Sequence, residues 1–86
     1  MTKIEILLKA ATMNEQSLIR ACEAYPIPKN RDEVTFLNEL IDRVTDMRDN
    51  LPHGKGYAGA RLIRTHMIDI LNEKIEEYLI NDLTKN

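Results

Sequence analysis

Proline and glycine divide this chain into three segments that can be helical. The first break, residues 25–30, holds two prolines one residue apart, and a proline inside a helix removes a backbone donor and clashes with the preceding turn. The second break, residues 50–56, holds one proline and two glycines, a composition typical of turns. We therefore expect an all-α chain, and its length of 86 residues indicates a single domain. The predicted helices cover residues 2–24, 31–50 and 57–82.

The second and third segments are the long helices of this prediction. Asn30 and Glu33 have the spacing of a capping box, which favours a helix start at residue 31. Apolar residues then recur at steps of three and four positions, as Val34, Leu37, Ile41 and Val44, with Leu40 and Met47 beside them. A short loop between two long helices makes them antiparallel neighbours, so we expect a helical hairpin with an additional N-terminal helix. That first helix is expected to bend near residues 12–15, where a second capping-box pattern occurs.

The apolar stripe of the third helix is wider than one neighbouring helix would cover. It contains Ile63, Met67, Ile70, Leu71, Ile75, Tyr78 and Leu79, and it is widened by Leu62 and Ile68. A domain of this size buries only about 60% of the surface of its unfolded chain, so its stability alone is marginal. Cys22 is the only cysteine, which excludes an internal disulfide and leaves no Cys/His cluster for a structural zinc. We therefore expect a homo-oligomer whose subunits share helix faces.

Charge and hydropathy exclude several classes of protein. The net charge is −2, from 12 basic and 14 acidic residues, whereas domains that bind duplex DNA are usually basic. Residues 1–5 lack the apolar run of a signal peptide, and no stretch reaches the ~18 apolar residues of a membrane span. A single cysteine fits a reducing compartment. We expect a cytoplasmic protein that binds neither duplex DNA nor a membrane.

The turn between the two long helices carries the main candidate site. From His53 to His66 there are three basic residues and two histidines but no acid. A glycine-containing loop leads here into a helix N-terminus, where unpaired N–H groups and the helix dipole favour an anion. The side chains predicted to bind a nucleotide are Lys55, Tyr57, Arg61 and Arg64. The alternative is a turn whose glycines only satisfy backbone geometry and whose charges are solvated.

Two other patterns point to different chemistry. Arg61 and His66 resemble the Arg-x4-His motif of the all-helical HEPN ribonucleases, which would act on an RNA phosphate at a dimer interface. Acidic residues on the two long helices, Glu73 and Glu77 among them, could bind magnesium, but a solvated charged face is the favoured interpretation. Cys22 has apolar neighbours at helical spacing and is expected to be buried. We predict no metal site, no cofactor and no catalytic residue.

Two stretches of the chain carry a family resemblance. They are Ala24–Pro28, an aromatic-Pro-x-Pro stretch, and Asn50–Lys55, a Leu-Pro-x-Gly-basic turn between two amphipathic helices. With this order of features from Tyr25 to about Tyr78, the chain resembles the helical hairpin domain of phage cyclic-nucleotide sponges, which counter CBASS and Thoeris immunity. Further matching positions are Ala58, Asn72 and Ile75.

The resemblance implies an oligomer that binds and sequesters a cyclic (oligo)nucleotide immune signal at subunit junctions without cleaving it. Tyr25 would stack on a base and Lys55 would contact a phosphate, in the host cytoplasm if a phage encodes the protein. One alternative is a protein–protein inhibitor or adaptor that acts through an acidic helix face. That face contains Asp42, Asp46 and Asp49. The HEPN-like ribonuclease is the third hypothesis.

Overall fold

The computed structural model describes the backbone of residues 15–84 and the side chains of residues 18–84 other than Lys55. Over this range the prediction of an all-α chain is confirmed, since the described residues form helices and turns and no strand. The elements are α2 (Glu15–Ala24), α3 (Arg31–Asp49), the short 3₁₀ helix η1 (Lys55–Tyr57) and α4 (Ala58–Thr84). Residues 2–14 of the predicted N-terminal helix, where the bend is expected, lie outside the described range.

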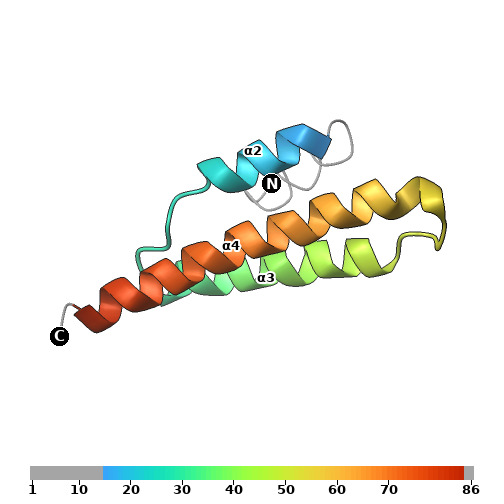
Figure 1. Cartoon of the computed structure of the whole chain (residues 1–86). Helices are drawn as coiled ribbons and strands as arrows, with labels where there is room; N and C mark the ends of the chain where they lie inside the picture. Colours follow the sequence, from blue (N-terminus) through green and yellow to red (C-terminus); the bar gives the residue numbers. More distant parts are fainter. Residues whose placement is uncertain (1–14, 85–86) are drawn as a thin grey trace.

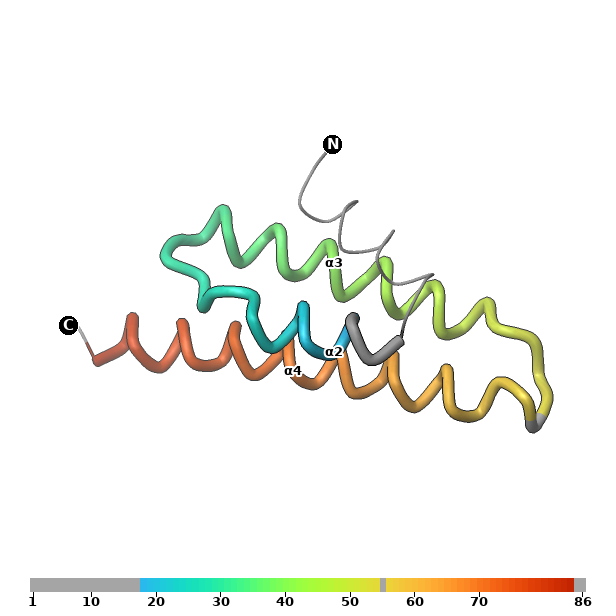
Figure 2. The backbone as a smooth tube through the Cα atoms, turned by 90° about the horizontal axis from the view of Figure 1, so that it is seen from above, coloured from blue at the N-terminus to red at the C-terminus, as the bar shows by residue number. Residues whose placement is uncertain are grey.

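The two long helices lie side by side and run in opposite directions. Figure 1 shows the turn at residues 50–57 (yellow) at one end of the α3–α4 pair, and the connection at residues 25–30 (teal) toward the other end. The short helix α2 lies on one side of the pair and runs along α4 in the same direction (Figures 1 and 2). The two proline-containing segments are therefore well separated within one chain.

Helix α3 begins where the capping pattern places it. Asn30 has an extended backbone (φ −154°, ψ 175°), and its Oδ1 accepts a hydrogen bond of 2.9 Å from the backbone N–H of Glu33. The Glu33 carboxylate accepts in turn from the backbone N–H of Lys29 at 2.7 Å, one residue earlier than the usual capping box would place it. Because Asp32 and Glu33 also lie at the positive end of the helix dipole, this helix start is supported by both hydrogen bonding and charge.

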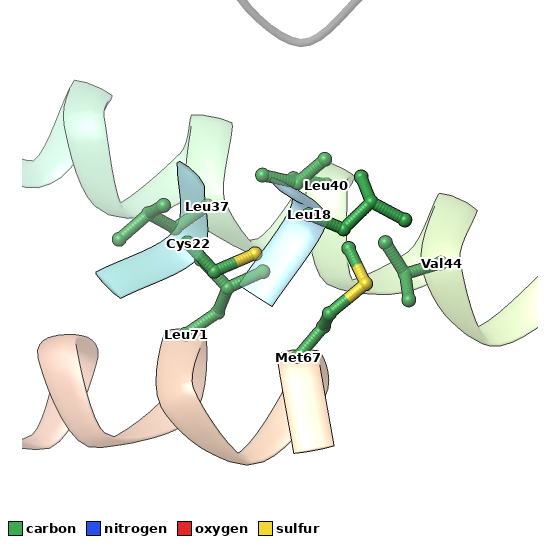
Figure 3. Packing of buried hydrophobic residues seen from close by; sticks show 7 residues of the cluster. All are labelled: Leu18, Cys22, Leu37, Leu40, Val44, Met67 and Leu71. Carbon is green, nitrogen blue, oxygen red and sulfur yellow. The ribbon is translucent and has the colours of Figure 1, made fainter. Parts of the chain in front are cut away.

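Within the described residues the core is one cluster to which α2, α3 and α4 contribute. Its fully buried side chains are Leu18 and Cys22 from α2, Leu37, Leu40 and Val44 from α3, and Met67 and Leu71 from α4 (Figure 3). The expected burial of Cys22 is confirmed. The centre of the α3 stripe was predicted incorrectly: Leu40 is fully buried, whereas Val34 and Ile41 are only half-buried. Leu40 and Leu18 belong to one cluster, so the buried stripe of α3 includes the side that α2 covers.

Helix α4 has two neighbours, which explains part of its wide apolar stripe. Ile63 and Ile70 lie beside residues of α2, where they line shallow grooves. The sequence analysis predicts that a second subunit covers the surplus apolar surface of this helix, but α2 of the same chain covers some of that surface. Leu62 is not covered and has 71% of its surface exposed, and Leu79, predicted in the stripe, is 50% exposed. Neither α4 nor any other described helix combines the length and the apolar composition needed to cross a bilayer.

Candidate functional site at the basic turn

The turn between α3 and α4 is closed by backbone hydrogen bonds at both ends. The N–H of Asn50 donates to the carbonyl of Asp46 at 2.9 Å, which ends α3, and the N–H of Tyr57 donates to the carbonyl of Gly54 at 3.1 Å, which forms η1. No described glycine has a positive φ, and a Cβ at Gly54 or Gly56 would meet nothing closer than 3.9 Å. Backbone geometry alone therefore does not require glycine at these two positions, contrary to the alternative interpretation of the turn.

Arg61 fastens this turn to the first coil of α4. Its Nη1 donates to the carbonyl of Pro52 at 2.9 Å and its Nη2 to the carbonyl of Gly54 at 3.2 Å. The planar guanidinium suits this task because its donors point in fixed, forked directions. The half-buried side chain holds the turn in one shape and places a positive charge beside the start of α4.

Arg64, the second arginine of the predicted site, lies in an unexpected environment. Only 7% of its surface is exposed, and its Nη1 donates to the carbonyl of Ala60 at 3.0 Å. Arg64, Met67 and Leu71 are the buried residues of α4 and follow one another at helical spacing. Arg64 is therefore directed toward the interior, whereas Arg61 is half-buried against the turn.

A third arginine, missed by the sequence analysis, approaches the turn from α3. The Nη1 of Arg48 donates to the hydroxyl of Thr65 on α4 at 3.3 Å, and its Nε lies 3.3 Å from a carboxylate oxygen of Asp49. Its position in the last turn of α3, directly before the break, is the sequence signal that could have identified it. Arg48 thus links the two helices beside the turn and brings a guanidinium there from α3, with its charge partly offset by Asp49.

The remaining predicted site residues are not all at this end of the molecule. Tyr57 closes η1 and is 43% exposed, so its ring is accessible beside the turn. Lys55 belongs to η1 by its backbone, and its side chain lies outside the described part of the structure. Tyr25 is half-buried against the core, and its segment lies away from the turn (Figure 1). One chain therefore brings together Tyr57, Arg61 and Arg64 but not Tyr25.

A groove between α2 and α4 is lined partly by acidic side chains. This groove of about 370 Å³ is lined by Glu23, His66, Ile70, Glu73, Lys74 and Glu77. Lys74 closes the end of α2, because its Nζ donates to the carbonyl of Glu23 at 3.0 Å. His66 faces this groove whereas Arg61 faces the turn, so the two residues of the Arg-x4-His motif do not converge within one chain. Among the described residues, no group of three or more His, Cys, Asp and Glu side chains could hold a metal ion.

Cys22 is sealed in the core between α2 and the two long helices (Figure 3). Burial raises the pKa of its thiol from an ordinary value of 9.0 to about 11, an effect that nearby Lys74 partly opposes. The thiol is therefore neutral at physiological pH and packs as a small apolar group.

No protein-family model, curated protein or solved structure matches the chain, so the geometry of the turn is the basis for its functional interpretation.

Proposed function

We propose that this chain is a phage-type anti-defence protein that binds a cyclic (oligo)nucleotide immune signal at the basic turn and sequesters it without cleavage. The observation that carries the proposal is the gathering of positive charge at one end of the α3–α4 pair. Arg48 and Arg61 approach this end from the two helices as half-buried side chains, and Arg64 adds its charge from the interior. The first turn of α4 contains no acidic residue. Basic groups at a helix N-terminus are well suited to hold a phosphate.

Different side chains at the turn can bind different parts of a nucleotide, Arg61 the phosphate and Tyr57 the base. A guanidinium has five N–H donors, and the two bonds from Arg61 to backbone carbonyls use only two of them. A phosphate oxygen is a strong acceptor for the other donors because the hydrogen bond is charge-assisted. The exposed ring of Tyr57 offers a surface on which a base can stack, and such stacking is tolerant of base identity.

Tyr25 can take part in this site only from a second subunit. Within one chain its segment lies away from the turn, as Figure 1 shows for residues 25–30 and 50–57. A ligand held at a subunit junction would contact the turn of one chain and the 25–30 segment of another. The proposal therefore includes a homo-oligomer that acts in the cytoplasm of the host cell.

Isothermal titration against a panel of cyclic dinucleotides, cyclic trinucleotides and cyclic ADP-ribose isomers tests this function. We expect saturable binding to at least one of them, with the ligand recovered intact afterwards. Tyr57→Ala and Lys55→Glu should weaken binding, the former by the roughly 1–3 kcal/mol typical of one stacked base. Arg20→Ala changes an exposed basic residue on α2 and serves as the control that retains affinity. Absence of heat with every ligand would refute the proposal.

The acidic face of α3 supports a second candidate function, a protein–protein inhibitor or adaptor. Asp42, Asp46 and Asp49 are all exposed and recur at three- and four-residue spacing along the helix. A basic partner surface would be attracted to this row. Charge reversal of the three aspartates should then abolish capture of one stoichiometric protein partner, whereas Lys55→Glu should leave capture unchanged.

A further inference from the structure

One side of α3 carries a row of large apolar side chains that is turned away from α4. Successive residues are about 100° apart around a helix, so Phe36, Leu40 and Met47 fall within about 40° of one another. Arg48, which donates to Thr65 of α4 and so marks the α4 side, lies about 100° from the middle of this row. We call the row, together with Arg43 between Leu40 and Met47, the Phe36 stripe.

The Phe36 stripe begins at the edge of the core and extends beyond it. Leu40 is fully buried in the cluster that includes Leu18 of α2, Met47 is half-buried, and Phe36 is 48% exposed. Arg43 is exposed, and the aliphatic stem of an arginine can lie along an apolar surface while its charge stays in water. An exposed aromatic ring continuous with buried neighbours indicates a surface that a further element can cover.

The chain itself contains an unassigned segment with a matching pattern. We call residues 2–14, which precede α2, the N-terminal arm. Its apolar residues Ile4, Leu7, Leu8 and Ala11 recur at steps of three and four, the pattern of a helix that buries one side. Nine residues of helix, 3–11, would span about 13 Å, and α3 rises about 16 Å from Phe36 to Met47. The arm therefore has the length and the apolar spacing to cover the stripe.

The point where the arm joins α2 lies at one end of the Phe36 stripe. Figure 1 shows that α2 begins toward the end of the molecule that holds the turn, where α3 also ends. Leu18, near the start of α2, belongs to the same buried cluster as Leu40 and Val44 (Figure 3). The chain therefore enters α2 near the Met47 end of the stripe. Residues 12–14, where the sequence predicts a bend, are then the connection through which the arm can turn back.

We propose that the N-terminal arm folds back over α3 as a helix and covers the Phe36 stripe, running parallel to α3 from its Phe36 end to its Met47 end. The covalent connection identifies the arm as the occupant. A segment held by a short linker is present at an effective concentration on the order of 1 mM, with which a second copy or another protein would have to compete. This intramolecular contact does not depend on nucleotide binding.

Nuclear Overhauser contacts in the unmodified full chain test the proposal directly. Phe36 is the only phenylalanine of the chain, so its ring signals are assigned without ambiguity. We expect contacts between the Phe36 ring and methyl groups of Ile4 or Leu7. In a mixture of isotope-labelled and unlabelled chains, these contacts should arise within one chain. Contacts only between labelled and unlabelled chains would show that a second copy covers the stripe. That result, or the lack of any contact between the ring and residues 2–14, would overturn the proposal.

Hydrogen exchange of the full chain provides an independent test with a matched control. Phe36→Lys places a charge on the stripe, whereas Asn38→Lys places one at an exposed position about 200° further around α3. Exchange of the backbone amides of residues 5–11 should be about tenfold faster or more in Phe36→Lys than in the wild type, because this segment then opens locally, while α4 keeps its protection. Asn38→Lys should exchange at these amides like the wild type. Equal exchange rates of residues 5–11 in the two variants would contradict the contact.

Discussion

Arg61 connects the sequence of the turn to its shape more directly than any other described side chain. Its two hydrogen bonds reach the carbonyls of Pro52 and Gly54, which lie nine and seven residues earlier in the chain. A residue predicted only as a ligand contact therefore also has a structural role. Both roles use the same property, a rigid fork of donors that carries a positive charge.

Replacing Arg61 separates its structural role from its charge. We expect Arg61→Ala to lower the free energy of unfolding by about 1–2 kcal/mol, since hydrogen bonds from a charged donor contribute roughly that much when partly exposed. Arg61→Lys should keep the positive charge but should be little more stable than Arg61→Ala, because an ammonium cannot donate to both carbonyls with the geometry of the guanidinium. Urea denaturation followed by circular dichroism measures both variants. Equal stability of wild type and Arg61→Ala would show that the two bonds are not maintained in solution.

From the burial of Cys22 we expect a specific dependence of the free energy of unfolding on pH. In the folded chain burial holds the pKa of the thiol at about 11, whereas the unfolded chain ionises near 9.0. Between these values the unfolded state loses its proton first, so stability falls as the pH rises from about 9 toward 11. To isolate the contribution of the thiol, the measurement is the difference between wild type and Cys22→Ala in denaturant titrations at pH 8 and pH 10.5. Parallel losses of stability in the two proteins would contradict the burial of the thiol.

Two site residues illustrate what sequence patterns reveal at the scale of one side chain. The proximity of Arg61 to the turn follows from its position in the chain. The burial of Arg64 was not predicted because arginine is rarely buried, although its helical spacing from Met67 and Leu71 places it on their side of α4. The contact of Arg48 could not be predicted for a different reason, since its bond to Thr65 depends on how two helices are aligned.

At the scale of whole helices, the sequence predicted a helix end correctly where the residues that define it lie close together in the chain. The start of α3 depends on Asn30 and Glu33, which interact within four residues of sequence, and the structure has this contact. The end of the third helix was placed at residue 82 instead of Thr84, because no capping residue marks it. The buried side of α3 differs from the predicted one because it depends on where α2 packs, and no local pattern specifies the position of α2.

The start of α3 can be tested by removing its cap. We expect Asn30→Ala to destabilise the chain by about 1 kcal/mol, because the N–H of Glu33 loses its acceptor. Asn38→Ala changes the same residue type at an exposed position inside the helix and should be neutral or slightly stabilising, since alanine favours helix. Thermal unfolding of the two variants under identical conditions compares them. A cap variant as stable as the Asn38 variant would show that this contact contributes nothing.

At the scale of the whole molecule, the two halves of α4 differ in charge, and the proposed function uses the basic half. Arg61 and Arg64 lie near the turn, whereas all five acidic residues of α4 lie from residue 69 onward. A phosphate held at the turn would be attracted by charges near the protein surface, and salt screens such charges. We therefore expect the affinity for a cyclic nucleotide to fall as salt rises from about 0.05 to 0.5 M, which shortens the Debye length to a few ångströms. Isothermal titration at both salt concentrations measures this, and an affinity insensitive to salt would contradict a contribution from charge.

The central claim is that the turn between α3 and α4 is the functional end of the molecule. A titration of the ¹⁵N-labelled chain with the cyclic nucleotides named above, followed by backbone amide chemical shifts, tests it most directly. We predict that the largest shift changes fall on residues 53–64 of the turn and the first coils of α4, with smaller changes at residues 25–30 from a neighbouring subunit. Changes confined to the acidic face of α3, or no changes with any of these ligands, would contradict the claim.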